Sequence, residues 1–368
     1  MNLGPEIRIA RPQQPLTEAW RQIPVEPRGS TLLGLSYRPL QASALGLDTR
    51  ATLQTLLTYP FQIIRLGAYW NRIESQPGQF VPDELDWSLD AAERAGKQII
   101  LNVGALKTFG YPEFFAPAWR LSPPLREGAL VTPASHAGLL AAATEFVTRI
   151  VERYRDHQAV IAWQVEHEAV DPLGVEHSWR LAAAFVQAEV AAVRAADPTR
   201  PVMLNGFLPT SWPVAAQQWL CTRDQGDSLS VAQGLADIVG IDYYPRHALM
   251  NIGGRTVYLN ANLNASHQRR RQRLFTWAAA TGHRLMISEG QAEPWETVTT
   301  PPNPQKWAMY SCPPQQVIAN YNQCLRWSQR APAALYAYLF WGAEYWLARE
   351  MSGDPSYAQA FTRILAES

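Results

Sequence analysis

The feature that most restricts the fold of this chain is a regular alternation of short apolar runs with longer amphipathic segments. The apolar runs have five to eight residues, the length and continuity of strands that are buried on both faces. They occupy residues 31–36, 62–66, 97–103, 159–166, 200–205, 237–244, 283–289 and 334–341. Patterns of helical period lie between them, at residues 48–57, 83–95, 135–154, 175–196, 265–280 and 314–329.

Eight buried strands that alternate with helices predict an α/β protein, a single (β/α)8 TIM barrel. We expect the barrel to span residues 30–368 and residues 1–29, which are rich in Pro and Arg, to form an N-terminal arm. A doubly wound open sheet is the alternative, but it would normally place a G-x-G-x-x-G turn after the first strand, and GLSYRPLQASALG is no such turn. The long loops follow the third, sixth and seventh strands, on the face where barrels build active sites.

Composition restricts the partners. Lys plus Arg and Asp plus Glu both number 32, so the formal charge is zero and we expect no nucleic-acid partner. The seven histidines include no H-x-H pair after the first strand and no H-E-x-x-H, which predicts that no metal or other cofactor takes part. Three cysteines allow at most one disulfide.

The sequence as given shows no address for a membrane or for export. Its N-terminus lacks the apolar region of a signal peptide, so we expect a cytoplasmic protein, or a secreted one if a signal was removed. The longest apolar stretch, around residues 331–343, is shorter than the roughly 18 residues that span a bilayer, so we expect no membrane association.

Two carboxylates follow strands on opposite sides of the predicted ring. Glu168 comes just after the fourth strand and Glu289 closes the seventh, so both side chains can point into one central cleft. Such a pair suits glycoside cleavage, in which one carboxylic acid protonates the leaving oxygen and the other carboxylate attacks the anomeric carbon. The alternative for each is an ion pair with an arginine at the end of the barrel. Glu166 points the same way as Glu168 and is the alternative acid.

Five segments resemble the retaining glycosidases of clan A, and they occur in the order that this clan has. WQVEHEAVDP (163–172) is similar to the strand-four motif with its Asn-Glu pair, and ISEGQAEPW (287–295) to the strand-seven motif that ends in Glu. Residues 65–104 resemble the second unit and third strand of cellulase-like and β-galactosidase-like members, IVGIDYYP (238–245) their sixth strand, and FWGAEYW (340–346) their eighth. The likeness extends over roughly residues 31–350.

The resemblance implies the roles of individual residues. Glu168 corresponds to the general acid/base and Glu289 to the nucleophile, with Arg65 and either Tyr243 or Tyr244 as donors to the nucleophile and Trp341 as the floor of the sugar subsite. We therefore expect double displacement on a β-glycoside, with exo action and with carboxyl groups about 5–5.5 Å apart. The substrate contacts predicted in this way are Arg65, His167, Tyr243, Tyr244, Trp341, Trp295, Trp70 and Asn102.

His167 departs from the resemblance. The clan has Asn before the acid/base, an amide that bonds the sugar 2-hydroxyl, whereas a neutral imidazole is larger and can donate one such bond. This departure leaves a second hypothesis open, a non-catalytic barrel that binds carbohydrate. The retained carboxylates, Arg65 and the tyrosines of the sixth strand favour the enzyme.

Overall fold

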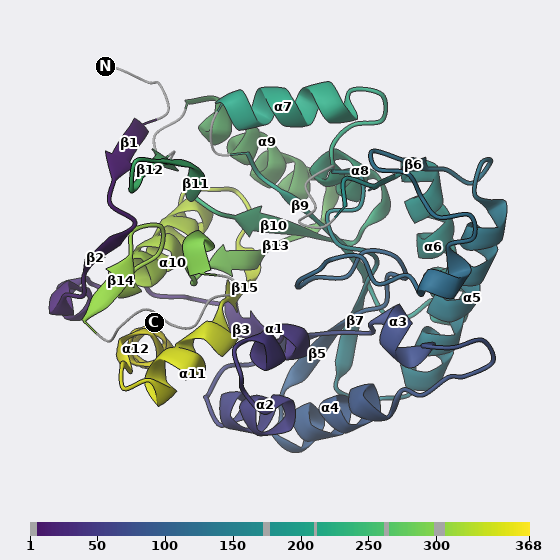
Figure 1. Cartoon of the computed structure of the whole chain (residues 1–368), viewed down its shortest axis with the longest axis horizontal. Helices are drawn as coiled ribbons and strands as arrows, with labels where there is room; N and C mark the ends of the chain where they lie inside the picture. The colour runs from purple at the N-terminus through teal and green to yellow at the C-terminus, as the bar shows by residue number, and fades with distance from the viewer. Residues whose placement is uncertain (1–5, 172–176, 210–211, 261–264, 298–305) are drawn as a thin grey trace. The chain divides into compact units, whose positions relative to one another are not determined.

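The computed structural model describes residues 6–171, 177–209, 212–260, 265–297 and 306–368 (Figure 1). In this part of the chain eight parallel strands form a closed barrel, in the order β10-β13-β15-β3-β4-β5-β7-β9. The strands are β3 (Leu32–Ser36), β4 (Ile63–Gly67), β5 (Gln98–Asn102), β7 (Val160–Gln164), β9 (Val202–Phe207), β10 (Ile238–Tyr243), β13 (Arg284–Gln291) and β15 (Leu335–Trp341). Each overlaps one predicted apolar run, so the predicted TIM barrel is confirmed.

The six predicted helical patterns all form helices. They are α2 (Thr49–Leu57), α4 (Asp83–Arg94), α5 (Ala137–Tyr154), α6 (Ala183–Ala196), α9 (Ala265–Thr281) and α10 (Pro314–Gln329). Asp48 begins α2 by accepting a hydrogen bond from the Ala51 N–H at 2.7 Å, which satisfies one of the unpaired donors of the first turn. The predicted start of α6 at residue 175 lies outside the described residues. Within them Arg180–Leu181 form strand β8, which pairs with β6 (Leu130–Val131), and α6 begins at Ala183.

Several elements have no counterpart in the sequence prediction. The short helices are α1 (Pro39–Ala44), α3 (Trp70–Ile73), α7 (Trp212–Thr222), α8 (Ser228–Leu235), α11 (Ala343–Met351) and α12 (Ser356–Glu367), with the 3-10 turns η1 (Glu18–Gln22), η2 (Ala118–Arg120) and η3 (Trp295–Thr297). The remaining strands are β1 (Glu6–Ala10), β2 (Gln13–Pro15), β11 (Arg246–Ile252), β12 (Arg255–Asn260) and β14 (Trp307–Met309).

The N-terminal arm is partly structured by pairing with the long loops. Strand β1 joins the β11–β12 hairpin and β2 joins β14, all antiparallel. The hairpin turns at Gly253 and Gly254, whose φ angles of 58° and 75° suit glycine in a tight hairpin turn. The sequence signal for it was the Gly-Gly pair within the loop that follows the sixth strand.

The contacts divide the chain into two compact units, which are described separately. Unit 1 consists of Met1–Gln62, Leu208–Ala215 and Ile241–Ser368, and unit 2 of Ile63–Phe207 and Ala216–Gly240. In unit 1, aromatic rings fill the space between β15 and its helices: the Phe340 ring lies 4.7 Å from Tyr338 and 5.0 Å from Phe361. In unit 2, α5 and α6 pack side by side (Figure 1). Many of the aromatic residues are therefore core residues.

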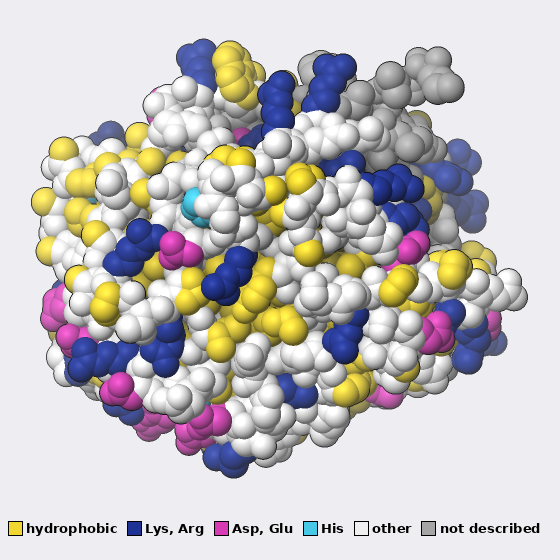
Figure 2. Space-filling view, turned by 180° about the vertical axis from the view of Figure 1, so that it is seen from behind, with side chains coloured by type: hydrophobic (Ala, Val, Ile, Leu, Met, Phe, Trp, Pro, Cys, Tyr) yellow, Lys and Arg dark blue, Asp and Glu magenta, His cyan; other side chains and the backbone are white. Residues whose placement is uncertain are grey.

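Side chains of both charges lie on the surface, as the equal numbers of basic and acidic residues lead one to expect. On the face shown in Figure 2, Lys and Arg side chains are spread over the surface, and Asp and Glu side chains lie among them mainly in its lower half. None of the helices in the described ranges is both long and apolar enough to cross a membrane.

Candidate active site

In unit 1, Glu289 forms a buried hydrogen bond with a tyrosine. It lies on β13, two residues before the end of the strand, and is 2% exposed. The Tyr244 hydroxyl donates to Glu289 Oε2 at 2.5 Å. The ring of Trp295, which is 41% exposed, lies 5.1 Å from the Tyr244 ring. These three predicted site residues therefore form a row that runs from the interior to the surface.

Local backbone geometry directs the Glu289 side chain. The pairing of β13 with β15 shifts register between Ile287 and Gly290, the kind of irregularity that re-aims side chains beside active sites. Gly290 makes room for the Tyr338 ring of β15, because a Cβ there would lie 2.1 Å from the Tyr338 hydroxyl. Replacing Gly290 with any larger residue would force the Tyr338 side chain to move.

The alternation of β10 decides between the two predicted tyrosines. Tyr243 is fully buried and packs edge-on against the Trp327 ring of α10 at 4.7 Å, so it lies on the helix side of the strand. Tyr244 is the residue that meets Glu289. Neighbouring residues of a strand point to opposite faces, so Tyr244 is the tyrosine that donates to Glu289, and a contact between Tyr243 and substrate stays a prediction that this packing does not favour.

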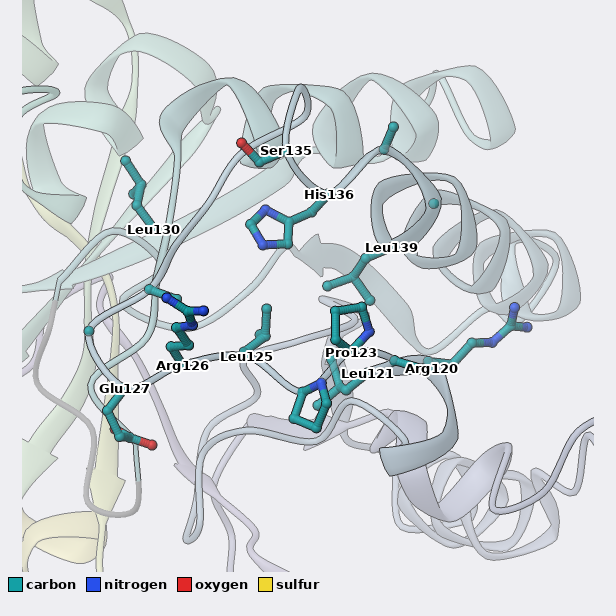
Figure 3. Close-up of a pocket in the computed structure, with 16 residues that line it drawn as sticks. Arg120, Leu121, Pro123, Leu125, Arg126, Glu127, Leu130, Ser135, His136 and Leu139 are labelled. Atoms are coloured by element: carbon teal, nitrogen blue, oxygen red, sulfur yellow. The ribbon is translucent and has the colours of Figure 1, made fainter.

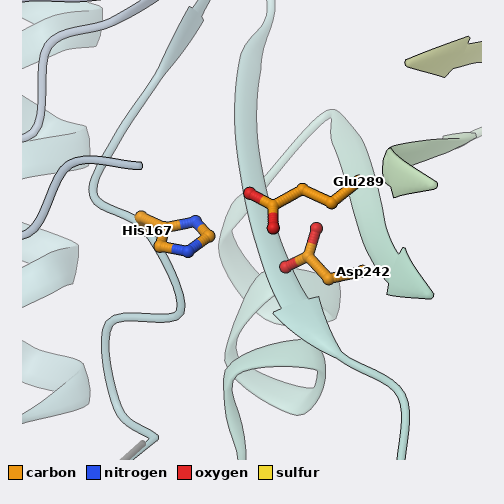
Figure 4. Close-up of side chains that lie close together, drawn as sticks. All are labelled: His167, Asp242 and Glu289. Atoms are coloured by element: carbon orange, nitrogen blue, oxygen red, sulfur yellow. The ribbon is translucent and has the colours of Figure 1, made fainter. Parts of the chain in front are cut away.

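The same alternation identifies a residue that the sequence analysis missed. Asp242, two residues before Tyr244, is fully buried and accepts a hydrogen bond from Ser288 Oγ at 2.7 Å. A carboxylate oxygen of Asp242 lies within 4.8 Å of one of Glu289, and Figure 4 shows the two side chains on their neighbouring strands. The period-two pattern of the IDYYP segment could have indicated it, since Asp242 and Tyr244 share a face.

In unit 2, the segment after β7 has an unusual backbone. Glu166 and Glu168 have φ angles of 55° and 43°, in the left-handed region that non-glycine residues rarely occupy. Backbone strain of this kind costs about 1–3 kcal/mol per residue and is concentrated at functional sites. The segment that carries Glu168 is therefore held in a conformation that local preferences disfavour.

Glu166 is the residue that holds this segment in place. Its carboxylate accepts hydrogen bonds from the backbone N–H groups of Leu106, at 2.9 Å, and Lys107, and it is fully buried. Gly104 allows the approach, because a Cβ there would lie 2.0 Å from the Glu166 nitrogen. Glu166 thus joins the loops after β5 and β7, and the alternative in which it serves as the acid is not supported.

His167 is held as a neutral imidazole. Asn205 Oδ1 accepts hydrogen bonds from Gln164 Nε2, at 2.9 Å, and the Glu168 N–H, which leaves the Asn205 amide nitrogen to donate to His167 Nδ1 at 2.9 Å. This assignment puts the ring proton on Nε2. Burial, and then the positive charges of Arg65 and Lys107, lower the pKa of His167 well below its usual value. The imidazole can therefore donate one hydrogen bond through Nε2.

Glu168 is half-buried, in contrast to Glu166 and His167, which are buried. Its backbone is tied down from both sides: the carbonyl accepts from Lys107 Nζ at 3.1 Å, and the N–H donates to Asn205 at 3.4 Å. The segment around a predicted acid/base is thus fixed by hydrogen bonds of its backbone, and Glu168 is more exposed than its two neighbours in this segment.

Arg65 and Asn102 are buried among the β4, β5 and β7 strands. The Arg65 guanidinium carbon lies 4.0 Å from the Phe109 ring centre, and one of its nitrogens lies 3.5 Å from Gln164 Oε1. Asn102 Oδ1 accepts from the Gly104 N–H at 2.9 Å, so this side chain shapes the loop after β5. A contact between either residue and substrate stays a prediction.

The packing of Trp70 does not favour the predicted contact with substrate. Trp70 is fully buried, its ring stacks on Phe146 of α5 at 5.4 Å, and its indole N–H donates to Glu74 at 2.9 Å. It begins the short helix α3, so its side chain turns into the layer between strands and helices. Proximity to a strand end in the sequence did not reveal this direction.

Unit 2 also contains a cavity of about 750 Å³ within the long connection between β5 and α5 (Figure 3). Leucine and proline side chains line it together with Arg120, Arg126, Glu127 and His136. Its lining, residues 120–130 and 135–139, includes none of the site residues predicted from the sequence.

Comparisons with known proteins agree with the barrel. Residues 72–223 match the model of the glycosyl hydrolases family 2 TIM barrel domain, a range that contains His167 and Glu168 but not Glu289. No curated protein matches the chain.

Solved structures with the same fold include several glycosidases. A GH5_18 protein from Streptomyces cattleya, in complex with GlcNAc, has a TM-score of 0.57 and 13% identity over 92% of this chain and 81% of that chain. Xylanase 10B from Thermotoga petrophila has a TM-score of 0.52 and 13% identity, covering 92% and 94%. The exo-β-1,4-mannosidase Op5Man5 from an Opitutaceae bacterium has a TM-score of 0.51 and 14% identity over 84% of this chain, which spans 52% of that longer protein.

Proposed function

We propose that this TIM barrel, whose residues 72–223 match the glycosyl hydrolases family 2 TIM barrel domain, is a glycoside hydrolase that cleaves β-glycosidic bonds by double displacement, with net retention of configuration. Glu289 is the nucleophile and Glu168 the general acid/base. The observation that carries the proposal is the buried Glu289 carboxylate at the end of β13, with the Tyr244 phenol donating to it at 2.5 Å.

Each carboxylate has surroundings that suit its role. A nucleophilic carboxylate must be correctly oriented toward the anomeric carbon, and the phenol that donates to Glu289 Oε2 helps to fix that orientation. The acid/base must exchange protons with the leaving group and with water, which suits the half-buried Glu168. The strained backbone at Glu168 further supports a functional role.

The reaction then has two steps. In the first, Glu289 attacks the anomeric carbon while Glu168 gives its proton to the leaving oxygen, which yields a glycosyl ester of Glu289 and the free alcohol. In the second, Glu168 removes a proton from water, the water oxygen bonds to the anomeric carbon, and Glu289 leaves as a carboxylate. The proposal requires the two carboxyl groups to lie about 5–5.5 Å apart in the complex with substrate.

Side chains near the two proposed catalytic carboxylates support a sugar substrate. His167, neutral with a proton on Nε2, replaces the asparagine of the clan as donor to the 2-hydroxyl. Trp295 and Trp341 offer indole surfaces for the apolar face of a pyranose. The long loops after β5, β10 and β13 favour a closed pocket and therefore exo action on short β-linked saccharides.

Release of nitrophenol from a panel of nitrophenyl β-glycosides tests the proposal. We expect hydrolysis of at least one galactoside, glucoside, mannoside or xyloside, with the β-anomer as the first product by NMR. Glu289→Ala should abolish release while the protein stays folded, and the exposed Glu152→Gln on α5 is the matched control. Glu168→Ala should slow alkyl glycosides far more than nitrophenyl glycosides, because only poor leaving groups need the proton.

Three results would contradict parts of the proposal. An α-anomer as first product would indicate inversion and remove Glu289 from the nucleophile role. Equal losses for good and poor leaving groups would remove Glu168 from the acid role. Sugar binding without release from any glycoside would favour the non-catalytic carbohydrate-binding barrel, for which the His167 departure is the argument.

A further inference from the structure

Unit 1 contains a buried cluster of one arginine and two carboxylates that the mechanism above does not use. Arg38, just after β3, donates through both terminal nitrogens to Glu293, at 2.6 and 2.8 Å. It also donates through Nε and Nη2 to Glu344, at 3.0 and 2.7 Å. The exposed fractions of the three residues are 3%, 7% and 0%, so solvent hardly reaches the cluster.

The cluster ties together the segments that follow three neighbouring strands, β13, β15 and β3. Glu293 follows β13, Glu344 lies in the first turn of α11 just after β15, and the Arg38 N–H donates to Glu344 Oε1 at 2.6 Å. Gly342 allows the closest approach, because a Cβ there would lie 2.7 Å from Cβ of Glu293. Backbone and side chains thus fix the geometry at the ends of these strands.

Stability alone is a poor explanation for such a cluster. Two carboxylates and one guanidinium leave one uncompensated negative charge away from water, and burial raises the pKa of Glu344. Buried ion pairs of this type are often no more stable than apolar side chains of similar volume, and their best attested use is to specify one arrangement. The arrangement that this cluster specifies must therefore be identified from its other contacts.

The remaining contact of Arg38 is with Trp341, the last residue of β15. The Arg38 guanidinium carbon lies 4.3 Å from the centre of the Trp341 ring, within the range of a cation–π contact. Arg38 is itself buried, whereas Trp341 is partly exposed. The guanidinium therefore covers one face of the indole from inside the protein, so a ligand that stacks on this ring would use the opposite face.

We propose that Arg38, held by Glu293 and Glu344, is a positioning residue that orients Trp341 as a platform for the apolar face of a β-linked pyranose. The inference rests on the proposed function and adds how the platform is set. Arg38 touches no substrate in this scheme. It acts through the ring of Trp341, and its two carboxylates hold the guanidinium against that ring at the end of β15.

A double-mutant cycle between Arg38 and Trp341 tests the inference, with the nitrophenyl glycoside that the wild-type protein hydrolyses best as the probe. We expect Arg38→Met to raise KM about tenfold with a smaller change in kcat, because platform contacts act mainly on binding. In a Trp341→Ala background, the same Arg38→Met change should leave KM within about twofold of the Trp341→Ala value. Arg38→Lys should restore little, since a lysine cannot bond both carboxylates and stack on the ring.

Two further variants separate positioning from folding. Arg38→Met leaves two buried carboxylates without their partner, so the charge-balanced triple variant R38M/E293Q/E344Q removes that penalty and should show the same rise in KM. Arg349→Met, which breaks another buried arginine pair of unit 1, with Asp354, is the matched control and should lower stability without the selective effect on KM.

The outcomes distinguish this inference from the proposed function. Equal effects of Arg38→Met in the wild-type and Trp341→Ala backgrounds would overturn the positioning role, even if Glu289→Ala abolishes hydrolysis as expected. If the wild-type protein hydrolyses nothing, the same cycle is measured on the dissociation constants of a monosaccharide panel by tryptophan fluorescence. Absence of coupling there, or no effect of Trp341→Ala on binding, would also overturn it.

Discussion

Replacing Glu189 with glutamine should make the protein increasingly more stable than the wild type as the pH rises. Glu189 lies on α6, fully buried beside Glu166, and neither of its oxygens has a hydrogen-bond partner of normal geometry in the described part of the chain. Burial, and then the charge of Glu166, raise the pKa of Glu189 well above its usual value. The Glu166 carboxylate accepts hydrogen bonds from two backbone N–H groups, which favour its charged form. Of these two neighbouring acids, Glu189 is therefore the one that keeps its proton.

The sign and size of the effect follow from proton linkage. Above the usual pKa of a glutamic acid the unfolded chain has released this proton, whereas the folded protein keeps it until its own raised pKa is passed. Between the pKa of Glu189 in the unfolded chain and its raised pKa in the folded protein, the free energy of unfolding of the wild type falls by about 1.4 kcal/mol for each pH unit. Below the unfolded-state pKa this contribution to stability is fully retained. The amide of the Glu189→Gln variant does not titrate, so the advantage of the variant grows at that rate and then levels off.

Urea unfolding followed by circular dichroism at several values between about pH 5 and pH 8 measures this difference. The exposed Glu152→Gln on the neighbouring α5 controls for the loss of one carboxylate from unit 2. A stability difference between Glu189→Gln and wild type that is the same at every pH would refute the buried-proton argument. Rates of glycoside hydrolysis measured at the same pH values would report whether the loop that Glu166 anchors loosens when Glu189 loses its proton.

Substitutions at three other residues have defined outcomes. Tyr244→Phe removes a hydrogen bond to a charged group, worth about 1.5–3 kcal/mol, so kcat/KM should fall roughly 10- to 150-fold; an unchanged value would mean that the contact with Glu289 is not used in the reaction. His167→Asn should keep most of the preference for a glycoside over its 2-deoxy analogue, and His167→Ala should lose it, as read from the ratio of kcat/KM values. Trp70→Ala should cost about 3–5 kcal/mol in unfolding free energy with KM of the folded protein unchanged, whereas a raised KM would return Trp70 to the substrate site.

The sequence alone predicted the barrel well because its signals are local. A strand buried on both faces needs a continuous apolar run, so all eight runs could be recognised without knowledge of their neighbours. The hairpin β11–β12 and the helices α7 and α8 were missed because they lie inside connections that appeared as loops, although Gly253-Gly254 was a usable signal. The strand β8, which precedes α6, depended on pairing with β6, a contact between segments distant in sequence.

The sequence located the segments that carry the predicted site residues better than it located the directions of their side chains. Which strand carries Glu289 and which segment carries Glu168 follows from the apolar pattern and the order of the motifs. The direction of a side chain depends on the strand face or the short helix on which it lies, and this separated Tyr244 from Tyr243 and buried Trp70 in the core. Asp242 was missed although it shares a strand face with Tyr244, and its contact with Ser288 on the neighbouring strand is a tertiary contact.

The α/β barrel and the two acidic positions at strand ends could be recognised from patterns along the chain. The chemistry around those positions depends on contacts between distant segments. The lowered pKa of His167 depends on burial, Arg65 and Lys107, its hydrogen bond on Asn205, and the anchoring of the Glu166 segment on N–H groups from the loop after β5. The Arg38 cluster behind Trp341 joins residues more than 250 positions apart, and packing in three dimensions alone brings such residues together.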